Sequence, residues 1–252
     1  MKNVLAVFAH PDDAELTCFG TLGILRERGY QVLVGIVTDG TAGSPQKSAR
    51  VRVQEAEQAC AIMGFELLRG GLHDGDLHYS SPLIMQVEEW VDENKPAIVV
   101  THDYHPAGID HQDHIAVARA VLNVVHRKPG IELLLQVEPS RGSRSFEPNA
   151  FIDVSPFAPK KLAAIACHKS QSHKDYLQPA YIRLRSSWWA AVSGIWNASE
   201  AAEEPHVEAF RIAKSSLFAS SALAFNRPTE VNAGAGPVDR VAPGYPRLRR
   251  VG

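Results

Sequence analysis

The chain has 252 residues, of which 45% are hydrophobic and 21% charged, and its formal net charge is -2. This is the composition of a soluble globular protein, and the near balance of charge gives no sign of a nucleic-acid or membrane-surface partner. The three cysteines, Cys18, Cys60 and Cys167, form no metal-type pair and no disulfide framework, which favours a reducing compartment. The apolar run Val4–Ala9 is too short for a signal sequence or a membrane span, so we expect a cytoplasmic protein.

Strand-like and helix-like segments alternate along the chain. The first is Val4–Ala9, a continuous apolar run typical of a strand buried on both faces of a parallel sheet. A helix over 14–28 follows and ends at Gly29, an expected C-cap. The further elements expected in chain order are the strand Gln31–Thr38, a helix over 48–63, the strand Phe65–Leu68, a helix over 81–93, the strand Ala97–Thr101, a helix over 114–126, the strands Leu133–Val137 and Phe151–Val154, and a helix over 157–167.

This alternation predicts an α/β fold with a mostly parallel sheet and right-handed crossovers. The chain shows no internal repeat and no interior linker, so we predict one domain over residues 1–225. The segment 170–204, which carries three of the four tryptophans, is not assigned to an element. Residues 226–252 are rich in Pro, Gly and Arg and are expected to form a flexible tail.

Polar side chains follow three of the predicted strands. In open α/β sheets, ligands bind beyond the carboxyl ends of the strands. His10-Pro11-Asp12-Asp13 follows the first strand, Thr38-Asp39-Gly40 follows the second, and a polar loop from His102 to Asp113 leads into the helix at His114. The sequence therefore predicts a functional site where these strand ends meet.

Three of these residues are candidate metal ligands. His10 and Asp13 lie three residues apart where a strand turns into a helix, so both can point into one cleft. His114 falls on the apolar stripe of its helix and faces the sheet, although a lone histidine there would more often be a satisfied core residue. Two histidines and one carboxylate leave an open position for water, which is the arrangement of a hydrolytic zinc site.

Other polar residues of the two clusters would complete the chemistry. With the pKa of a bound water lowered to about 7, Asp12 could act as the general base, and a protonated His111 could donate to the developing oxyanion. Asp113 is expected to orient His111 by a hydrogen bond. Helix capping is the alternative role for the acidic residues, and we expect neither His102 nor His105 to be a ligand. Metal, base and oxyanion donor together indicate amide or ester hydrolysis.

Several motifs occur in the order found in one known family. They are Ala9-His10-Pro11-Asp12-Asp13-Ala14-Glu15, Thr38-Asp39-Gly40, Arg52-x-x-Glu55, Asp74-Gly75-Asp76-Leu77, His111-x-Asp113-His114 and His168-x-Ser170-Gln171. Over roughly two thirds of the chain the sequence thus resembles the PIG-L (LmbE-like) zinc-dependent N-deacetylases. The resemblance implies a Rossmann-like three-layer sandwich, one Zn²⁺ per chain bound by His10, Asp13 and His114, and hydrolysis of an N-acetyl group on an amino sugar or glycoconjugate.

The resemblance also implies roles for individual residues. Asp12 would be the base, and His111, paired with Asp113, would support the oxyanion. Arg52 would reach the substrate, although an ion pair with a glutamate three residues further on is the alternative. We expect Asp39, at the end of the second strand, to bind substrate as well.

Other functions stay open at this point. A dinucleotide-dependent oxidoreductase is disfavoured, because the first turn lacks a G-x-G-x-x-G motif and its acidic residues would repel a pyrophosphate. A non-catalytic metal-binding member of the fold would not need Asp12. An amidase or deacylase that cleaves a larger or non-sugar conjugate on the same zinc site is not excluded, nor is another divalent metal. We therefore expect a hydrolase of linear amide C–N bonds whose substrate is a small-molecule N-acyl amino sugar or a glycoconjugate. We expect no nucleic-acid partner. The sequence leaves the oligomeric state open, and a homo-oligomer is possible.

Overall fold

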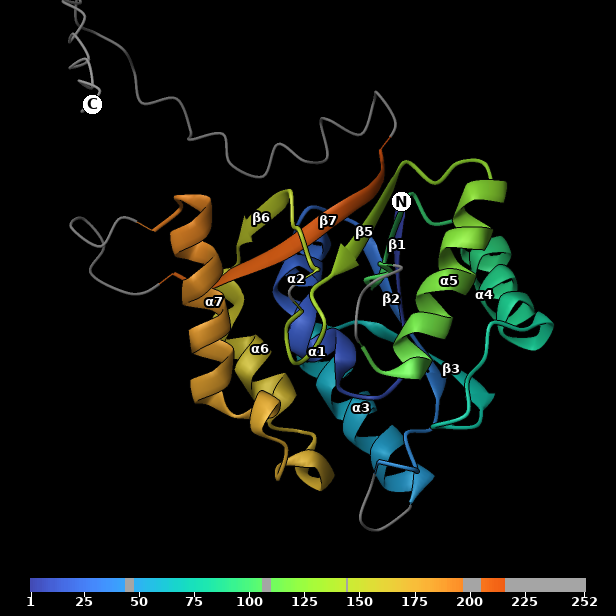
Figure 1. Cartoon of the computed structure of the whole chain (residues 1–252), viewed down its shortest axis with the longest axis horizontal. Helices are drawn as coiled ribbons and strands as arrows, with labels where there is room; N and C mark the ends of the chain where they lie inside the picture. The colour runs from blue at the N-terminus through green and yellow to red at the C-terminus, as the bar shows by residue number, and fades with distance from the viewer. Residues whose placement is uncertain (44–47, 106–109, 144, 197–204, 216–252) are drawn as a thin grey trace, which may run out of the picture.

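The computed structural model describes residues 1–43, 48–105, 110–143, 145–196 and 205–215. Within these residues seven strands form one sheet of order β3-β2-β1-β4-β5-β7-β6 (Figure 1). Strands β1 to β5 pair in parallel, and β7 pairs antiparallel with both β5 and β6. The strands are β1 (Asn3–Phe8), β2 (Gln31–Thr38), β3 (Glu66–Leu72), β4 (Ile98–His102), β5 (Leu133–Val137), β6 (Ala150–Asp153) and β7 (Val207–Ser215).

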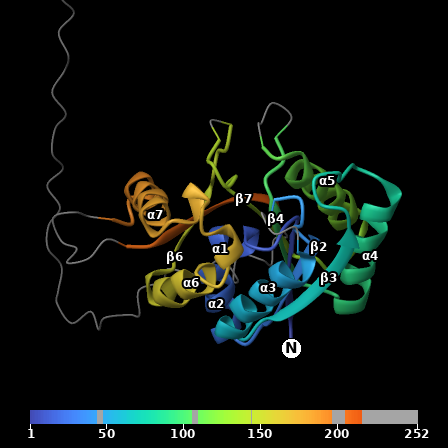
Figure 2. The same cartoon turned by 90° about the horizontal axis from the view of Figure 1, so that it is seen from below.

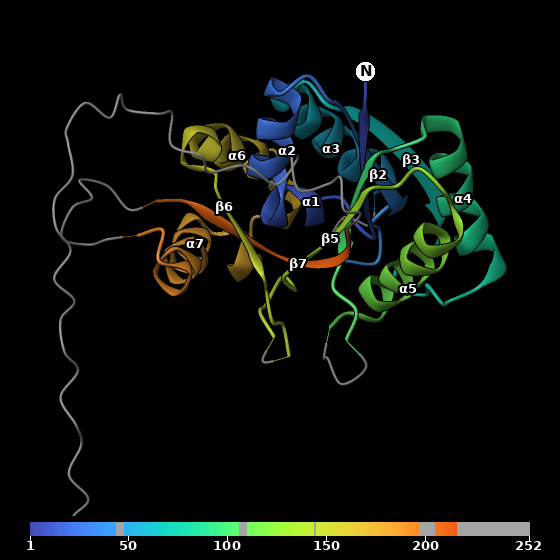
Figure 3. The same cartoon turned by 90° about the horizontal axis from the view of Figure 1, so that it is seen from above.

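Helices cover both faces of this sheet (Figures 2 and 3). Alternate residues of β1 point to opposite faces, so Ala6 packs with α1, α2, α3 and α6, whereas Val7 packs with α4 and α5. The α-helices are α1 (Asp13–Thr17), α2 (Phe19–Glu27), α3 (Ala49–Met63), α4 (Ser81–Asn94), α5 (Gln112–Arg127), α6 (Ala158–Ile165) and α7 (Pro179–Ser193). The predicted single-domain α/β sandwich with a mostly parallel sheet is confirmed. Among the residues that the structure describes, no helix is long and apolar enough to cross a membrane.

Local sequence accounts for most of the element limits. Helix α3 begins after Ser48, whose hydroxyl accepts a hydrogen bond from Val51 N, and it ends at Gly64, whose φ of 70° favours glycine. The helix expected over 14–28 is two helices, because the backbone leaves the helical conformation at Cys18. The helix expected over 157–167 begins with a 3-10 turn, η1 (Ser155–Phe157).

The C-terminal part of the described chain departs most from expectation. Strand β7 has no counterpart in the predictions, and the unassigned segment holds two 3-10 turns, η2 (Lys169–Gln171) and η3 (Asp175–Leu177), followed by α7. Helix α7 packs against β6 and β7 and lies at that end of the sheet (Figure 3). The expected domain limit at residue 225 and the expected tail over 226–252 lie outside the described residues.

Candidate metal centre

The turn after β1 places two acidic side chains and one imidazole at the carboxyl edge of the sheet. It is held by hydrogen bonds from Ala9 N to His102 Nε2 (3.0 Å) and from His10 N to Asp13 Oδ2 (2.8 Å). Asp12 adopts φ 110° and ψ -20°, a conformation that costs free energy for a residue other than glycine. Strain of this kind is concentrated at functional sites, where the surrounding structure holds it in place.

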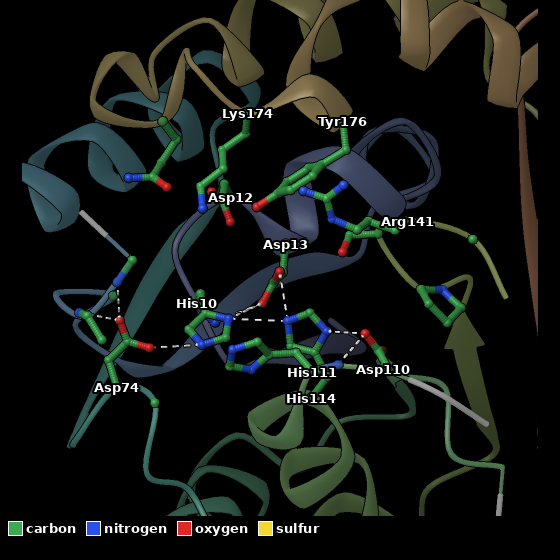
Figure 4. Close-up of a pocket in the computed structure, with 18 of the residues that line it drawn as sticks. His10, Asp12, Asp13, Asp74, Asp110, His111, His114, Arg141, Lys174 and Tyr176 are labelled. Atoms are coloured by element: carbon green, nitrogen blue, oxygen red, sulfur yellow. Dashed lines mark hydrogen bonds and ion pairs between the residues drawn. The ribbon is translucent and has the colours of Figure 1, made fainter. Parts of the chain in front are cut away.

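Four donor atoms from the turn after β1, from α1 and from α5 converge here, two of them the oxygens of Asp13 (Figure 4). His10 Nδ1 lies 3.2 Å from His114 Nε2 and 3.4 Å from Asp13 Oδ2, and His114 Nε2 lies 3.4 Å from Asp13 Oδ1. A tetrahedral ion with ligands at about 2.0–2.1 Å separates neighbouring ligands by about 3.3–3.4 Å. The two imidazole nitrogens have this spacing, and the Asp13 carboxylate faces His10 through Oδ2 and His114 through Oδ1, so the chemistry of these donors suits a divalent metal ion such as zinc.

The second nitrogen of each imidazole is held by a carboxylate. His10 Nε2 lies 3.0 Å from Asp74 Oδ1 and 3.2 Å from Asp113 Oδ2, and His114 Nδ1 lies 3.0 Å from Asp110 Oδ1. A carboxylate accepts a hydrogen bond, so these contacts put the ring proton on the outer nitrogen and leave the lone pair of the inner nitrogen facing the other donors. Histidines that bind metals are oriented in this way.

The carboxylates also shift the pKa values of the cluster. Burial lowers the pKa of His10, but Asp113, Asp13 and Asp74 more than offset this and raise it well above 6.5. Burial likewise lowers the pKa of His114, and the net effect of Asp13 and Asp110 raises it to about 9. Metal binding requires neutral imidazoles, so a metal ion has to compete with protons at this site.

Two further histidines lie beside the cluster. His102 stacks on His114 with ring centroids 4.0 Å apart, and its Nε2 lies 3.4 Å from Asp13 Oδ2. That nitrogen already accepts the hydrogen bond from Ala9 N, and burial lowers the pKa of His102 to about 4, so the ring is neutral and its lone pair is in use. Donor atoms of His111 lie within 4.8 Å of those of His10 and His114.

His111 is the N-cap of α5. Its Nδ1 accepts a hydrogen bond from Asp113 N (3.3 Å), so the proton of the neutral ring is on Nε2. Burial lowers the pKa of His111, and His10 and His114 lower it further. Both the burial and the neighbouring histidines therefore favour the neutral form of His111, in which Nε2–H is the donor.

The hydrogen bond between Asp113 and His111 is made by the Asp113 backbone N–H, whereas the Asp113 carboxylate has other partners. The carboxylate accepts hydrogen bonds from Gly75 N (2.7 Å) and Leu77 N (3.1 Å) and lies against His10. The first turn of α5 directs this side chain toward the loop after β3, whose backbone N–H groups need an acceptor. Asp113 thus supports the imidazole of His10.

Asp12 and Arg52 form a buried pair beside the cluster. The Arg52 guanidinium contacts Pro11 O and lies 3.4 Å from Asp12 Oδ2. Burial raises the pKa of Asp12 to about 6, although Arg52 opposes the shift. Arg52 does not form the alternative ion pair with Glu55, because the Glu55 carboxylate accepts hydrogen bonds from Ser170 N and Oγ instead.

A pocket of about 920 Å³ opens above these residues. Arg52 lines it, as expected of a substrate-binding residue, but Asp39 does not. Asp39 Oδ1 accepts hydrogen bonds from Thr41 N (3.0 Å) and Thr41 Oγ1 (2.8 Å), so this carboxylate stabilises the turn after β2. Its expected role in substrate binding stays a prediction.

Some pocket residues were not predicted. Asp110 could have been found, because it lies four residues before His114, just ahead of α5, and its Oδ1 is 3.0 Å from His114 Nδ1. Arg141, Lys174 and Tyr176 line the side of the pocket opposite the candidate metal ligands. No sequence motif near these three residues connects them with those ligands. Figure 4 shows these three side chains reaching the pocket from segments far along the chain.

Comparisons with known proteins find deacetylases among the similar sequences. The PIG-L family model, described as GlcNAc-PI de-N-acetylase, matches residues 5–125. The chain is 29% identical over 201 residues to a probable N-acetyl-alpha-D-glucosaminyl L-malate deacetylase 2 of Bacillus cereus, covering 73% of this chain and 90% of that protein. It is 30% identical over 175 residues to the uncharacterized deacetylase YaiS of Escherichia coli, covering 67% of this chain and 91% of that protein.

Solved structures share the fold. The N,N'-diacetylchitobiose deacetylase of Pyrococcus horikoshii superposes with a TM-score of 0.70 at 21% identity, covering 84% of this chain and 83% of that one. GalB, the 4-carboxy-2-hydroxymuconate hydratase of Pseudomonas putida, superposes with a TM-score of 0.69 at 21% identity, covering 92% of this chain and 100% of that one. Because one fold serves both reactions, the fold alone does not decide the chemistry.

Proposed function

The chain belongs to the PIG-L family, and on this premise we propose that it is a metal-dependent hydrolase that removes an N-acetyl or other N-acyl group from an amino-sugar-type small molecule or glycoconjugate. The observation that carries the proposal is the approach of two imidazole nitrogens, His10 Nδ1 and His114 Nε2, to 3.2 Å from each other, with one oxygen of the Asp13 carboxylate 3.4 Å from each of them. The deacetylase relatives support the amide as the bond that is cleaved.

His10, Asp13 and His114 would hold the divalent ion, with zinc as the first candidate. Such an ion lowers the pKa of a coordinated water to about 7 and polarises the acyl carbonyl. Asp74, Asp110 and Asp113 hold the outer imidazole nitrogens and thereby keep the inner lone pairs aimed at the ion.

Asp12 is the proposed general base. It lines the pocket next to Asp13 and is 4% exposed. With a pKa of about 6, its carboxylate is mostly ionised at neutral pH and can accept a proton from the attacking water. The same value makes the protonated form acidic enough to pass that proton to the leaving amine.

We assign His111 to the reacting carbonyl and Arg52 to the general base. The Nε2–H of neutral His111 would donate to the oxygen on which charge develops. Arg52 lies against Asp12 and lines the pocket, so it would fix the orientation of the base at the edge of the substrate site.

The test combines metal content with acetate release. Purified protein is analysed for bound metal, and acetate is measured after incubation with N-acetylglucosamine, its methyl glycoside, diacetylchitobiose and analogues with longer N-acyl chains. We expect about one metal ion per chain and metal-dependent acyl release. Asp12→Ala should keep the metal and lose at least about 100-fold in kcat, whereas His114→Ala should lose both.

His126→Ala is the matched control, because His126 lies on the same helix and is exposed. It should retain both metal and activity. Undiminished turnover after removal of the metal, or in Asp12→Ala, would contradict the mechanism. Hydration of an unsaturated dicarboxylate without release of an acyl group from any amide would contradict the proposed reaction.

A further inference from the structure

The turn that follows β2 is bonded directly to the turn that follows β1. Thr38 N and Thr38 Oγ1 both donate to Ala9 O (3.0 and 2.9 Å), and Gly40 N donates to Thr38 Oγ1 (3.3 Å). The Thr38 side chain is buried, so its hydroxyl connects the two turns without competition from solvent. The position of Gly40 is therefore tied to the chain that leads into Asp12.

Gly40 occupies a place in which no side chain fits. Its φ is 66°, and a Cβ at this position would lie 2.8 Å from Pro11 Cδ and 3.1 Å from both Arg52 Cζ and Arg52 Nε. Glycine allows this backbone conformation and this close approach at the same time. The backbone at Gly40 thus packs against the Pro11 ring and the Arg52 guanidinium together.

The Arg52 guanidinium depends on this packing. The hydrogen bonds that the structure describes for it involve Nη2, which contacts Pro11 O and lies 3.4 Å from Asp12 Oδ2. The buried Nε has no hydrogen-bond partner among the described residues. Two parallel bonds to one carboxylate would fix the plane of a guanidinium, but bonds through a single nitrogen leave the plane free to turn. Contact with Gly40 and Pro11 therefore restricts it.

The two groups that Gly40 contacts lie on either side of Asp12. Pro11 precedes Asp12 in the chain, where the backbone adopts the strained φ of 110°, and Arg52 lies against the Asp12 carboxylate. A shift of the guanidinium would therefore be passed to that carboxylate. Displacement of a catalytic group by about 1 Å can lower a rate about 100-fold.

We propose that Thr38 and Gly40 are positioning residues for the general base. The Thr38 hydroxyl fixes the turn after β2, Gly40 provides the seat of the Arg52 guanidinium, and the guanidinium holds the Asp12 carboxylate at the pocket. The proposal rests on the proposed function, in which Asp12 takes the proton of the attacking water. Thr38 and Gly40 act through Arg52 and supply no group to the reacting carbonyl.

The kinetics of Gly40→Ala give the first test. We expect kcat to fall by about 10- to 100-fold, with the bound metal retained and KM changed far less. Gly29→Ala is the matched control, because Gly29 also has a positive φ (87°) but no atom lies within 4 Å of its added Cβ. It should keep the wild-type kcat. A raised KM at unchanged kcat, or loss of the metal, would overturn the proposal.

A double-mutant cycle then shows whether Gly40 acts through Arg52. In an Arg52→Ala background the added methyl group has no guanidinium to displace. The reduction of kcat by Gly40→Ala should therefore be at least about threefold smaller there than in the wild-type background, which is the coupling expected of residues in contact. Equal reductions in the two backgrounds would overturn the proposal.

Variants of Thr38 make the test independent of whether Gly40→Ala folds. Thr38→Val keeps the shape of the side chain and removes the hydroxyl between Ala9 O and Gly40 N. We expect it to retain the metal and to lower kcat by about 10-fold or more. Thr38→Ser keeps the hydroxyl and should retain most of the wild-type kcat. Equal kcat values for the two variants would contradict the role of the hydroxyl.

Nuclear magnetic resonance separates this proposal from the proposed function. The Nε–H signal of Arg52, assigned as the signal that Arg52→Lys removes, reports the guanidinium position without substrate. Gly40→Ala and Thr38→Val should shift or broaden it, and Gly29→Ala should not. Acyl release by the wild type with a signal that neither variant changes would overturn the positioning role and leave the hydrolase proposal standing. A signal that both variants change would support the seat of Arg52 even if no amide were cleaved.

Discussion

Substitution of Asp113 tests how the candidate metal ligands are held in place. Its carboxylate is fully buried and accepts hydrogen bonds from Gly75 N (2.7 Å) and Leu77 N (3.1 Å), and its Oδ2 lies 3.2 Å from His10 Nε2. Asp113→Asn keeps the shape but removes the charge and replaces one acceptor oxygen with an NH₂ group. That group faces N–H donors, so at least one hydrogen bond is lost.

The expected effect is on metal affinity. Loss of a carboxylate behind a metal-binding histidine typically weakens binding about 10- to 100-fold, which corresponds to about 1.4–2.7 kcal/mol. We expect the zinc Kd of Asp113→Asn, measured by competition with a chromophoric chelator, to rise by this factor. At saturating metal, kcat should fall much less than Kd rises, because the carboxylate holds a ligand and does not touch the reacting carbonyl.

The alternative role predicts the reverse pattern. If Asp113 acted by orienting His111, the zinc Kd would stay unchanged and kcat at saturating metal would fall. Asp76→Asn is the matched control. Asp76 lies in the loop after β3 that Asp113 contacts, and its side chain is 77% exposed. A Kd for Asp113→Asn within about twofold of both wild type and this control would refute the assignment of Asp113 to His10, since a supporting carboxylate should change it by at least about 10-fold.

Three further predictions concern the stability of the scaffold. Glu208→Gln should lower the free energy of unfolding by about 3–5 kcal/mol in denaturant titrations, because its buried lysine partner then lacks a countercharge. Gly20→Ala should be destabilising despite a gain in helix propensity of about 1 kcal/mol, since a Cβ there would lie 2.5–2.9 Å from three atoms of a valine side chain; a higher Tm would contradict this. Burial lowers the pKa of His168, but Glu15 raises it above 6.5 overall, so the stabilisation by this pair is complete below about pH 6.5 and is lost as the pH rises through the raised value. The loss of unfolding free energy in His168→Gln should therefore be larger at about pH 5.5 than at about pH 8.5, and equal losses would count against a charged pair.

The parallel part of the sheet was predictable because its signals are local. Apolar runs such as Gln31–Thr38 mark strands buried on both faces, and residues such as Ser48 and Gly64 mark helix limits. The three candidate ligands were also predictable, because each follows a strand end or starts a helix at the same edge of the sheet. These arguments need no knowledge of which distant segments touch.

Strand β7 was not predictable in this way. Its charged residues, Glu208, Arg211 and Lys214, recur every third position, so the segment lacks the alternation of a half-buried strand. Each of these charges finds its partner on a distant element: the Glu208 carboxylate, for example, accepts hydrogen bonds from Gly20 N and Thr21 N at the start of α2. Only the assembled fold shows that Glu208 can be buried and that Arg211 and Lys214 can be half-buried.

The same distinction applies to the two sides of the pocket. The candidate metal ligands and Asp12 belong to two short motifs at the carboxyl edge of the parallel strands, so sequence spacing and strand order predict that they lie together. Arg141 and Lys174 belong to different loops, and they meet in the pocket only because α7 packs against β6 and β7 and holds the loop after β5. Charge on this side of the pocket can therefore vary without disturbing the metal cluster, and substrate preference within one family can change while the hydrolytic chemistry stays the same.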